Sequence, residues 1–522
     1  MRILTFHGYL LRGTGSNIYN ASLAAALVRM GHEVHLLCQE RDAAALPFVD
    51  AVGRWSSGRL KIQVLREPVR CTVYTPDIGR VLPVYVADAY DGFDARPFPE
   101  LTDDELDHYL SANVAAVRDV ADVARPDVAL ANHAVMGPAV LARALGGQVP
   151  YAVKIHGSAL EYTVRPHPDR FLSYVHEGLA LAGGVLVGSR HTARSLFEVT
   201  GDKSLVEKTR LGPPGVDVES YRPRPMPEAA AAMRTLADRL EGAGGAWGGD
   251  PGAAAALREL DPMSEPLVTY VGKLIVSKGV DLLVAAWPLV VARVPAARLC
   301  VVGFGTYRDG LLRLMECIGT GDLDGAREVA AAGRELEGGP RAELSYLAAF
   351  LEGLDGPART AYLDVAARAM ARVHLTGRLE HEDLPSILAA AQAQVVPSTF
   401  PEAFGMVAAE AAACGALPVS AAHSGLAEVT ATLAPELDPP LRHLLSFDLG
   451  PRAVENLAGR LTEWLLLDEP TRAGAAQALA DVARGRYSWE GVAEGVIAAA
   501  RGRLSELPEP LAAEEPPRPA SG

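Results

Sequence analysis

Cysteine and lysine are both scarce in this chain of 522 residues. The five cysteines are scattered and form no C-x-x-C pair, so the sequence favours neither a disulfide framework nor a zinc finger. No apolar run approaches the roughly 18 residues that a membrane-spanning helix needs, and the N-terminus lacks the charged-then-apolar pattern of a signal peptide. We therefore expect a cytoplasmic protein without stable membrane insertion.

Positive charge is also in short supply, because the formal net charge is −15 at pH 7. A chain whose main partner is nucleic acid or an anionic membrane would need a clustered basic excess. The expected partners are therefore small molecules and no nucleic acid, and a homo-oligomer is compatible with the sequence. The length predicts two or three domains at roughly 100–200 residues each, and 49 % hydrophobic residues suffice for large cores.

Short apolar runs alternate with stretches of helical period in the first part of the chain. Ser16 is the expected N-cap of the first helix, and Gly31 follows its end. This alternation predicts a parallel sheet covered by helices on both faces. Strands are predicted over 2–6, 33–38, 128–131, 151–155 and 185–188, and helices over 17–30, 103–124, 137–145 and 169–182.

The alternation breaks at 222–265, where proline and glycine are dense, and restarts at Leu267 with strands predicted over 267–271, 298–302, 372–376, 394–397 and 417–420. The predicted fold is α/β, with two doubly wound Rossmann-like domains facing across a cleft and a helical insertion in the second. The predicted parts are an N-terminal domain over 1–221, a linker insertion over 222–265, a C-terminal domain over 266–484 with the helical insertion at 317–371, and a disordered tail over 506–522.

The most informative motif spans residues 397–420. A strand ends at Pro397, a loop carries Glu402, and a helix begins near Phe404. The free amides of that first helical turn, at the positive end of the helix dipole, form an anion site. Glu410 follows eight positions after Glu402, so the two carboxylates can address separated parts of one extended ligand. Two glutamates at this spacing would by themselves be read as a solvated helix face, but the strand–loop–helix–strand context favours a site.

This motif resembles the E-x7-E signature of the retaining GT-B-type glycosyltransferases of family 4, the group similar to glycogen synthase and sucrose-phosphate synthase. The resemblance covers nearly the whole chain apart from 222–265, 317–371 and the tail. It implies that the C-terminal helix, expected within 485–505, returns to the first domain.

The resemblance also assigns roles within the motif. Glu402 is expected to face the hydroxyls of the donor sugar and to be catalytic, and Glu410 to bind the ribose of the nucleotide. The backbone amides expected to meet the donor sugar and diphosphate are those of Phe404, Gly405 and Met406.

Two of only six lysines, Lys273 and Lys278, fall in one turn that follows a predicted strand. Ammonium groups at that place can neutralise a departing diphosphate, although two solvated loop lysines are the simpler interpretation of the pattern alone. The resemblance implies that both are catalytic and that both bind the donor together with Gly272. Relatives usually carry arginine at the position of Lys273, so a point charge replaces a bidentate grip on phosphate here.

A histidine beside a glycine at a strand end can reach a ligand, and His156 has that setting. The resemblance places His156 by the donor sugar, near the reacting centre, as a catalytic residue. His133 also follows a strand and is a candidate acceptor contact. Arg170 is a second acceptor candidate, because it lies where some relatives bind an acceptor phosphate. A hydrogen-bonded loop histidine without catalytic role is the alternative interpretation of both histidines.

Glycine-bearing turns complete the predicted donor site. The first loop lacks the third glycine of a dinucleotide-binding fingerprint, so by itself it is weak evidence for nucleotide binding. The resemblance assigns Gly15 and Ser16 to the donor, and it places Gly303 and Arg378 near the nucleobase. Packing is the alternative interpretation of Gly303 and Arg378.

No metal and no resident cofactor are expected. The D-x-D pattern at 322–324 lies far in sequence from the other motifs and is interpreted as solvated acidic surface. The co-substrate is expected to be a nucleotide-diphosphate sugar, with UDP as the nucleotide. The sequence therefore predicts a retaining, metal-independent hexosyltransferase that acts on a soluble acceptor, such as a small phosphorylated polyol, a sugar or a natural product. The alternatives are a GT-B-fold phosphorylase, a sugar-nucleotide epimerase, or a catalytically silent binder of sugar nucleotides.

Overall fold

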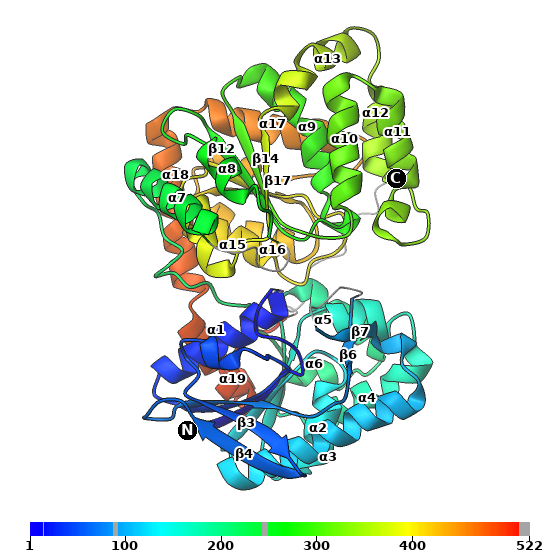
Figure 1. Ribbon diagram of the computed structural model, residues 1–522, viewed down its shortest axis with the longest axis vertical. Helices are drawn as coiled ribbons and strands as arrows, with labels where there is room; N and C mark the ends of the chain where they lie inside the picture. Colours follow the sequence, from blue (N-terminus) through cyan, green and yellow to red (C-terminus); the bar gives the residue numbers. More distant parts are fainter. Residues whose placement is uncertain (14, 87–91, 243–248, 511–522) are drawn as a thin grey trace. The chain divides into compact units, whose positions relative to one another are not determined.

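The computed structural model describes residues 1–13, 15–86, 92–242 and 249–510, which form two compact units (Figure 1). Unit 1 contains Met1–Gly215 and the chain from Tyr487 onward, and unit 2 contains Val216–Arg486. The chain therefore returns to unit 1 after completing unit 2. The returning segment contains helix α19 (Trp489–Ala500), which packs against α1 (Gly15–Arg29) in unit 1.

Unit 1 contains a nine-stranded sheet within the described residues, in the order β11-β10-β9-β8-β1-β2-β5-β3-β4. Its strands are parallel except for the antiparallel pair β3 and β4. The strand order runs in opposite directions on the two sides of the β1/β8 boundary, which makes that boundary a topological switch point. The strands are β1 (Arg2–Phe6), β2 (Glu33–Leu37), β3 (Ala51–Ser56), β4 (Arg59–Val64), β5 (Cys71–Thr75), β8 (Val128–Asn132), β9 (Tyr151–Ile155), β10 (Gly184–Val187) and β11 (Thr209–Leu211), with β6 (Val81–Val84) and β7 (Asp94–Pro97) paired separately.

Helices cover both faces of this sheet. In β1, Ile3 joins a buried cluster that includes α1 and α19, whereas Leu4 and Phe6 join the cluster on the opposite face. This alternation follows from the two-residue period of strand side chains, and it confirms the predicted layered α/β architecture. The other helices of unit 1 are α2 (Asp103–Ala124), α3 (Gly137–Leu145), α4 (Pro168–Ala180), α5 (Arg190–Thr200) and α6 (Leu205–Lys208).

Two local predictions in unit 1 need correction. Helix α1 begins at Gly15, so Ser16 lies inside its first turn and is not the N-cap. The region between β2 and α2, for which no elements were predicted, contains β3, β4 and β5. Strands β3 and β4 form a hairpin through Ser57 and Gly58, which have φ angles of 51° and 71°. Consecutive residues of positive φ are typical of the tight turns that match the twist of a hairpin.

In the described residues of unit 2, six parallel strands form a sheet in the order β14-β13-β12-β15-β16-β17. This is the doubly wound order in which the first strand is central and its switch point lies beside the fourth, between β12 and β15. The strands are β12 (Leu267–Val271), β13 (Arg298–Val302), β14 (Val373–Gly377), β15 (Ala393–Val396), β16 (Leu417–Ala421) and β17 (Ser446–Phe447). The helices of the sheet layers are α9 (Val280–Arg293), α10 (Arg308–Thr320), α14 (Leu384–Leu388), α15 (Met406–Ala413), α16 (Ser424–Leu433), α17 (Ala453–Leu466) and α18 (Glu469–Arg486).

The segment 222–265 is not the linker that its proline and glycine content predicts. It contains α7 (Met226–Gly242) and α8 (Ala253–Arg258), and both helices pack within unit 2. Helix α7 buries Ala230, Met233 and Ala237. These residues recur at helical spacing, but the flanking Pro- and Gly-rich stretches hide that short apolar stripe when composition is averaged.

The insertion over 317–371 is helical as predicted. It contains α11 (Leu323–Ala332), the short 3-10 helix η5 (Arg334–Glu337), α12 (Ser345–Gly353) and α13 (Gly356–Met370). Within the predicted tail, residues 511–522 lie outside the described residues. Among the helices that the structure describes, none is long and apolar enough to cross a membrane.

Candidate functional site

The two loops at the switch point of unit 2 are in direct contact. One loop connects β12 to α9 and carries Lys278; the other connects β15 to α15 and carries Glu402. The backbone N–H of Thr399 donates to the carbonyl of Ser277 at 3.0 Å. At Gly279, where φ is +66°, a Cβ atom would lie 2.0 Å from the carbonyl oxygen of Pro397. The close approach of the loops therefore depends on a glycine at this position.

Glu402 is held by two side-chain donors. The ammonium of Lys278 forms an ion pair and hydrogen bond with its Oε1, and the hydroxyl of Ser398 donates to the same oxygen at 2.6 Å. Burial alone would raise the pKa of Glu402, but the charge and hydrogen bond of Lys278, together with the Ser398 hydrogen bond and the nearby His423, lower it on balance. The site therefore presents an ionised carboxylate beside a cation.

A second set of contacts fixes the backbone of Glu402, and the sequence did not reveal it. The N–H of Glu402 donates to the hydroxyl oxygen of Ser424 at 2.9 Å. His423 donates from Nε2 to the carbonyl of Ser398 at 2.7 Å, which leaves its Nδ1 to accept from Ser424 at 3.1 Å. His423 and Ser424 follow β16, the next strand of the sheet. Their place at a strand end is the signal that could have identified them.

Glu410 lies further along α15 and is almost fully buried, with 3 % of its side chain exposed. Nε2 of His381 donates to its Oε1 at 2.8 Å. Burial alone would lower the pKa of His381, but the carboxylate of Glu410 outweighs that effect and raises it. The hydroxyl of Tyr221 donates to the carbonyl of His381 at 2.8 Å, so the histidine is also anchored through its backbone. Neither His381 nor Tyr221 stood out in the sequence.

The predicted glycine turns meet at the carboxyl ends of β12 and β13. The N–H of Gly272 donates to the carbonyl of Val302 at 3.0 Å, and the N–H of Gly303 donates to the carbonyl of Gly377 at 2.9 Å. A Cβ atom on Gly303 would lie 1.9 Å from the carbonyl oxygen of Gly272, so packing alone requires glycine there. The side chain of Arg378 is 9 % exposed and pairs with Glu380 at 2.9 Å.

The remaining predicted residues of unit 2 surround Glu402 in sequence or structure. Gly405, with a φ of +113°, directly precedes α15, and Met406 is the first residue of that helix. Phe404 is buried. In the lysine turn, the carbonyl of Lys273 accepts a hydrogen bond from the hydroxyl of Tyr270 at 2.9 Å. The structure thus brings Lys278 and Glu402 together and leaves Glu410 in a separate pair with His381.

At the switch point of unit 1, a buried polar network joins β1, α1 and β8. Nε2 of His7 donates to Oδ1 of Asn17 at 3.0 Å, and Nδ2 of Asn20 donates to Nδ1 of His7 at 3.0 Å. Oδ1 of Asn132 accepts from Nε2 of His156 at 2.7 Å. Asn132 and Asn20 also exchange hydrogen bonds, which links His7 to His156 through two amides. Burial lowers the pKa of His7 to about 4 and that of His156 well below its ordinary value, so both rings are neutral at pH 7.

His133 lies between these two histidines. Its ring centroid is 4.9 Å from that of His156 and 4.3 Å from that of Tyr85. Among the residues that the structure describes, neither buried ring nitrogen of His133 has a hydrogen-bond partner, and burial lowers its pKa well below the ordinary value. His133 also has a φ of +71°, a backbone region that non-glycine residues seldom occupy. A buried polar ring without partners in a strained backbone is typical of functional positions.

Of the other residues predicted in unit 1, Gly15 and Ser16 begin α1 beside this network, where the carbonyl of Ser16 accepts from Asn20 at 2.8 Å. Arg170 has different partners. Its guanidinium donates to the carbonyls of Pro99 and Leu101 at 2.9 and 2.6 Å and pairs with Asp103 at 2.9 Å. These bonds tie α4 to the start of α2, and the role of Arg170 in acceptor binding stays a prediction.

The D-x-D pattern has local partners. Asp322 caps α11 by accepting from the N–H of Gly325 at 2.9 Å, and Asp324 pairs with Arg327 at 2.6 Å. Within the part of the chain that the structure describes, no group of three or more His, Cys, Asp and Glu side chains is arranged to hold a metal ion.

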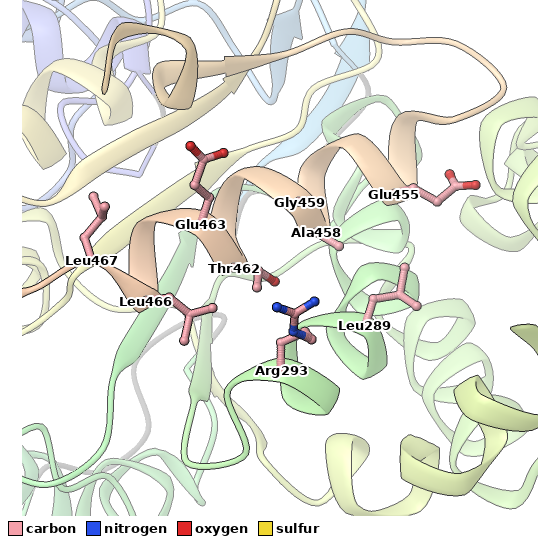
Figure 2. A pocket seen from close by; sticks show the side chains of 9 residues that line it. All are labelled: Leu289, Arg293, Glu455, Ala458, Gly459, Thr462, Glu463, Leu466 and Leu467. Carbon is pink, nitrogen blue, oxygen red and sulfur yellow. The ribbon is translucent and has the colours of Figure 1, made fainter. Parts of the chain in front are cut away.

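A surface groove of about 570 Å³ lies elsewhere in unit 2, between α9 and α17 (Figure 2). Leu289 and Arg293 of α9 face Thr462 and Leu466 of α17 across it. None of the residues predicted from the sequence lines this groove, and the loop pair at the switch point remains the better candidate.

Comparisons with known proteins match the two units to different families. Residues 14–212 match the family described as glycosyl transferase 4-like domain, and residues 355–435 match glycosyl transferases group 1. The chain is 25 % identical over 493 residues to a D-inositol 3-phosphate glycosyltransferase of Xylanimonas cellulosilytica, covering 92 % of this chain and 90 % of that protein.

Solved structures agree in fold. Sucrose-phosphate synthase from Thermosynechococcus elongatus aligns with a TM-score of 0.56 at 20 % identity, covering 97 % of this chain and 99 % of that one. The catalytic domain of starch synthase IV from Arabidopsis thaliana, bound to ADP and acarbose, aligns with a TM-score of 0.57 at 14 % identity, again over 97 % and 99 %. Glu402 and Glu410 lie in the second matched stretch, and His133 and His156 lie in the first. Lys273 and Lys278 lie outside both.

Proposed function

Because the chain belongs to the GT-B glycosyltransferases, with a 4-like domain followed by a group 1 domain, we propose that it transfers a sugar from a nucleotide-diphosphate donor to a small soluble acceptor with retention of the anomeric configuration. The observation that carries this proposal is the Lys278–Glu402 pair, with Ser398, at the switch point of unit 2. Ligands of open parallel α/β sheets bind at the carboxyl ends of the strands at such a point.

The donor is proposed to bind to unit 2 through its charges. The ammonium groups of Lys273 and Lys278, together with the N-terminal amides of α15, meet the diphosphate and stabilise the negative charge that develops as it departs. Glu402 then accepts hydrogen bonds from sugar hydroxyls, and Glu410 accepts those of the ribose. These protein cations carry the charge neutralisation, so the reaction is proposed to need no metal.

The acceptor is proposed to use the polar network of unit 1. Neutral imidazoles both donate and accept hydrogen bonds, and His156 and His133 are therefore suited to sugar or polyol hydroxyls. The relative from Xylanimonas is described as acting on D-inositol 3-phosphate, so a small phosphorylated polyol is the first acceptor class to test. In the proposed reaction the acceptor oxygen attacks the face that the diphosphate leaves, and the acceptor proton passes to the departing phosphate oxygen.

The test is donor turnover by the purified chain. UDP-, GDP-, ADP- and dTDP-sugars are each supplied with and without EDTA, and with and without pooled acceptors that include inositol phosphates, and release of nucleotide diphosphate is followed. We expect release from UDP-sugar that is stimulated by an acceptor, insensitive to EDTA and abolished in Glu402→Ala. The anomeric configuration of the product, read by NMR coupling constants, tests retention.

The alternatives give different results in this assay and in a parallel one that supplies an oligosaccharide with inorganic phosphate. A phosphorylase would release a sugar phosphate from an oligosaccharide and inorganic phosphate, and an epimerase would convert the donor without an acceptor. A silent binder would shift the melting temperature with a donor and turn over none. If no nucleotide sugar binds, the proposed function is wrong.

A further inference from the structure

The helical insertion of unit 2 contacts the loop that carries Lys278. Glu337, the last residue of η5, accepts a hydrogen bond at Oε2 from the backbone N–H of Val276 at 2.9 Å. Only 11 % of the Glu337 side chain is exposed, and Val276 is buried. Val276 is the first residue of the short 3-10 helix η4 (Val276–Lys278), whose last residue is Lys278.

This hydrogen bond lies next to other backbone contacts that hold the Val276–Lys278 turn. The carbonyl of Ser277 accepts from Thr399 at 3.0 Å, and the N–H of Leu274 donates to Phe304 at 2.7 Å. Glu337 thus completes a set of contacts that fixes the turn on both sides of Ser277. The first N–H groups of a helix lack partners within it, and a carboxylate accepts such a bond strongly.

We propose that Glu337 is a positioning residue through which the insertion holds the Val276–Lys278 turn so that Lys278 meets the donor diphosphate. The proposal rests on the proposed function for the role of Lys278, but the positioning itself is independent of any reaction. Without Glu337, the buried N–H of Val276 has no partner, and the turn must shift to satisfy it. A shift of this kind moves the ammonium relative to Glu402 and lowers catalysis, because charge stabilisation depends on placement.

The activity test uses two substitutions of Glu337 and a control substitution elsewhere in η5. Glu337→Ala removes the acceptor, Glu337→Gln keeps an acceptor oxygen of similar reach, and Glu335→Ala changes an exposed neighbour in η5. We expect Glu337→Ala to lower kcat about tenfold and to raise the donor KM while the acceptor KM is unchanged. The kcat of Glu337→Gln should be within about twofold of that of the parent, and the kcat of Glu335→Ala should equal that of the parent.

Two further measurements separate positioning from general stability. If Glu337 acts through Lys278, Glu337→Ala should add no loss in a Lys278→Ala background. The chain has only six lysines, so lysine labelled with carbon-13 at Cε gives a resolvable Lys278 signal. We expect that signal to shift in Glu337→Ala but not in Glu337→Gln or Glu335→Ala.

The proposal is overturned if the Lys278 signal stays in place in Glu337→Ala. It is equally overturned if the loss of activity persists in the Lys278→Ala background, or if Glu337→Gln fails together with a lowered melting temperature. If the signal moves as expected while Lys278→Ala and Glu402→Ala keep full donor turnover, the positioning is right and the proposed function is wrong.

Discussion

Lys278 and Glu402 form an ion pair although they lie 124 positions apart in the chain. They meet because β12 and β15 are neighbours in the sheet, so the loops after these strands leave from the same edge. Each side chain is partly exposed, with 32 % and 21 % of its surface accessible. In the proposed reaction, the donor diphosphate can therefore contact Lys278 while the ion pair with Glu402 stays in place, and the surrounding residues need not rearrange.

A double-mutant cycle should show that the two residues act as a unit. We expect Lys278→Met and Glu402→Gln each to lower donor turnover by about 10²–10³-fold, because each removes charge stabilisation from the same site. The fold loss of turnover in the double variant should be much smaller than the product of the two single-variant fold losses. In urea unfolding, the pair should show a coupling of about 1–2 kcal/mol. The exposed pair Arg313–Glu328 is the matched control, with a coupling below about 0.5 kcal/mol. Additive losses of activity would contradict a shared role.

Gly279→Ala should disrupt the contact between the two loops. A methyl group there would clash with the carbonyl of Pro397 and strain a backbone with a φ of +66°. We expect the free energy of unfolding to fall by more than about 1 kcal/mol and donor turnover to fall at least about tenfold. Gly353→Ala is the control, because a Cβ atom there meets nothing within 4 Å. That variant should unfold at the same or slightly higher urea concentration. Equal behaviour of the two variants would show that the loops tolerate separation.

The sequence predicts the parallel strands and the residues at their ends better than it predicts the surrounding contacts. Glu402 and Lys278 could be identified because each lies in a loop directly after an apolar strand. His381 could not, because its importance comes from contact with Glu410, which only the folded chain brings close. Ser424 has the strand-end position as a signal, but its contact with the backbone of Glu402 is visible only in the folded chain. Glu337 is a similar case, since a surface-like acidic residue in an insertion has no pattern of its own.

The same distinction explains where the fold predicted from the sequence was wrong. Strand β4 is largely exposed, so it lacks the apolar run that identifies buried strands such as β12. Helix α7 has an apolar stripe, but it lies between proline- and glycine-rich stretches that are typical of linkers. Periodicity identifies elements that are buried on a whole face, and it fails for short elements that pack through a few residues.

His7 should make the protein sensitive to mild acid. Burial lowers its pKa from 6.5 to about 4, so between these pH values the unfolded chain takes up a proton that the folded chain does not. Stability therefore falls as the pH drops from 6.5 toward 4, by about 3 kcal/mol for His7 alone. Urea unfolding measured across this pH range should show that the free energy of unfolding falls less steeply in His7→Gln than in the parent chain.

The control for this acid effect is His108→Gln, which changes an exposed histidine of α2. That variant should keep the steep loss of stability of the parent chain. His7→Gln should be less stable than the parent at pH 7, because glutamine cannot reproduce both hydrogen bonds to Asn17 and Asn20. An unchanged acid slope in His7→Gln would mean that other groups cause the sensitivity.

His381 should produce the opposite pH dependence. Its pKa is raised above the ordinary 6.5 because the buried carboxylate of Glu410 favours the protonated ring despite burial. The stabilisation is therefore fully present below pH 6.5 and is lost as the pH rises through the raised pKa of the folded state. His381→Gln keeps a donor for Glu410 but not the charge. The difference in unfolding free energy between the parent and His381→Gln should be largest near pH 6 and should shrink toward pH 9. His443→Gln, which breaks the exposed pair of His443 with Glu463, should change stability little at any pH. A constant difference for His381→Gln from pH 6 to 9 would mean that the Glu410 contact acts as a neutral hydrogen bond rather than as an ion pair.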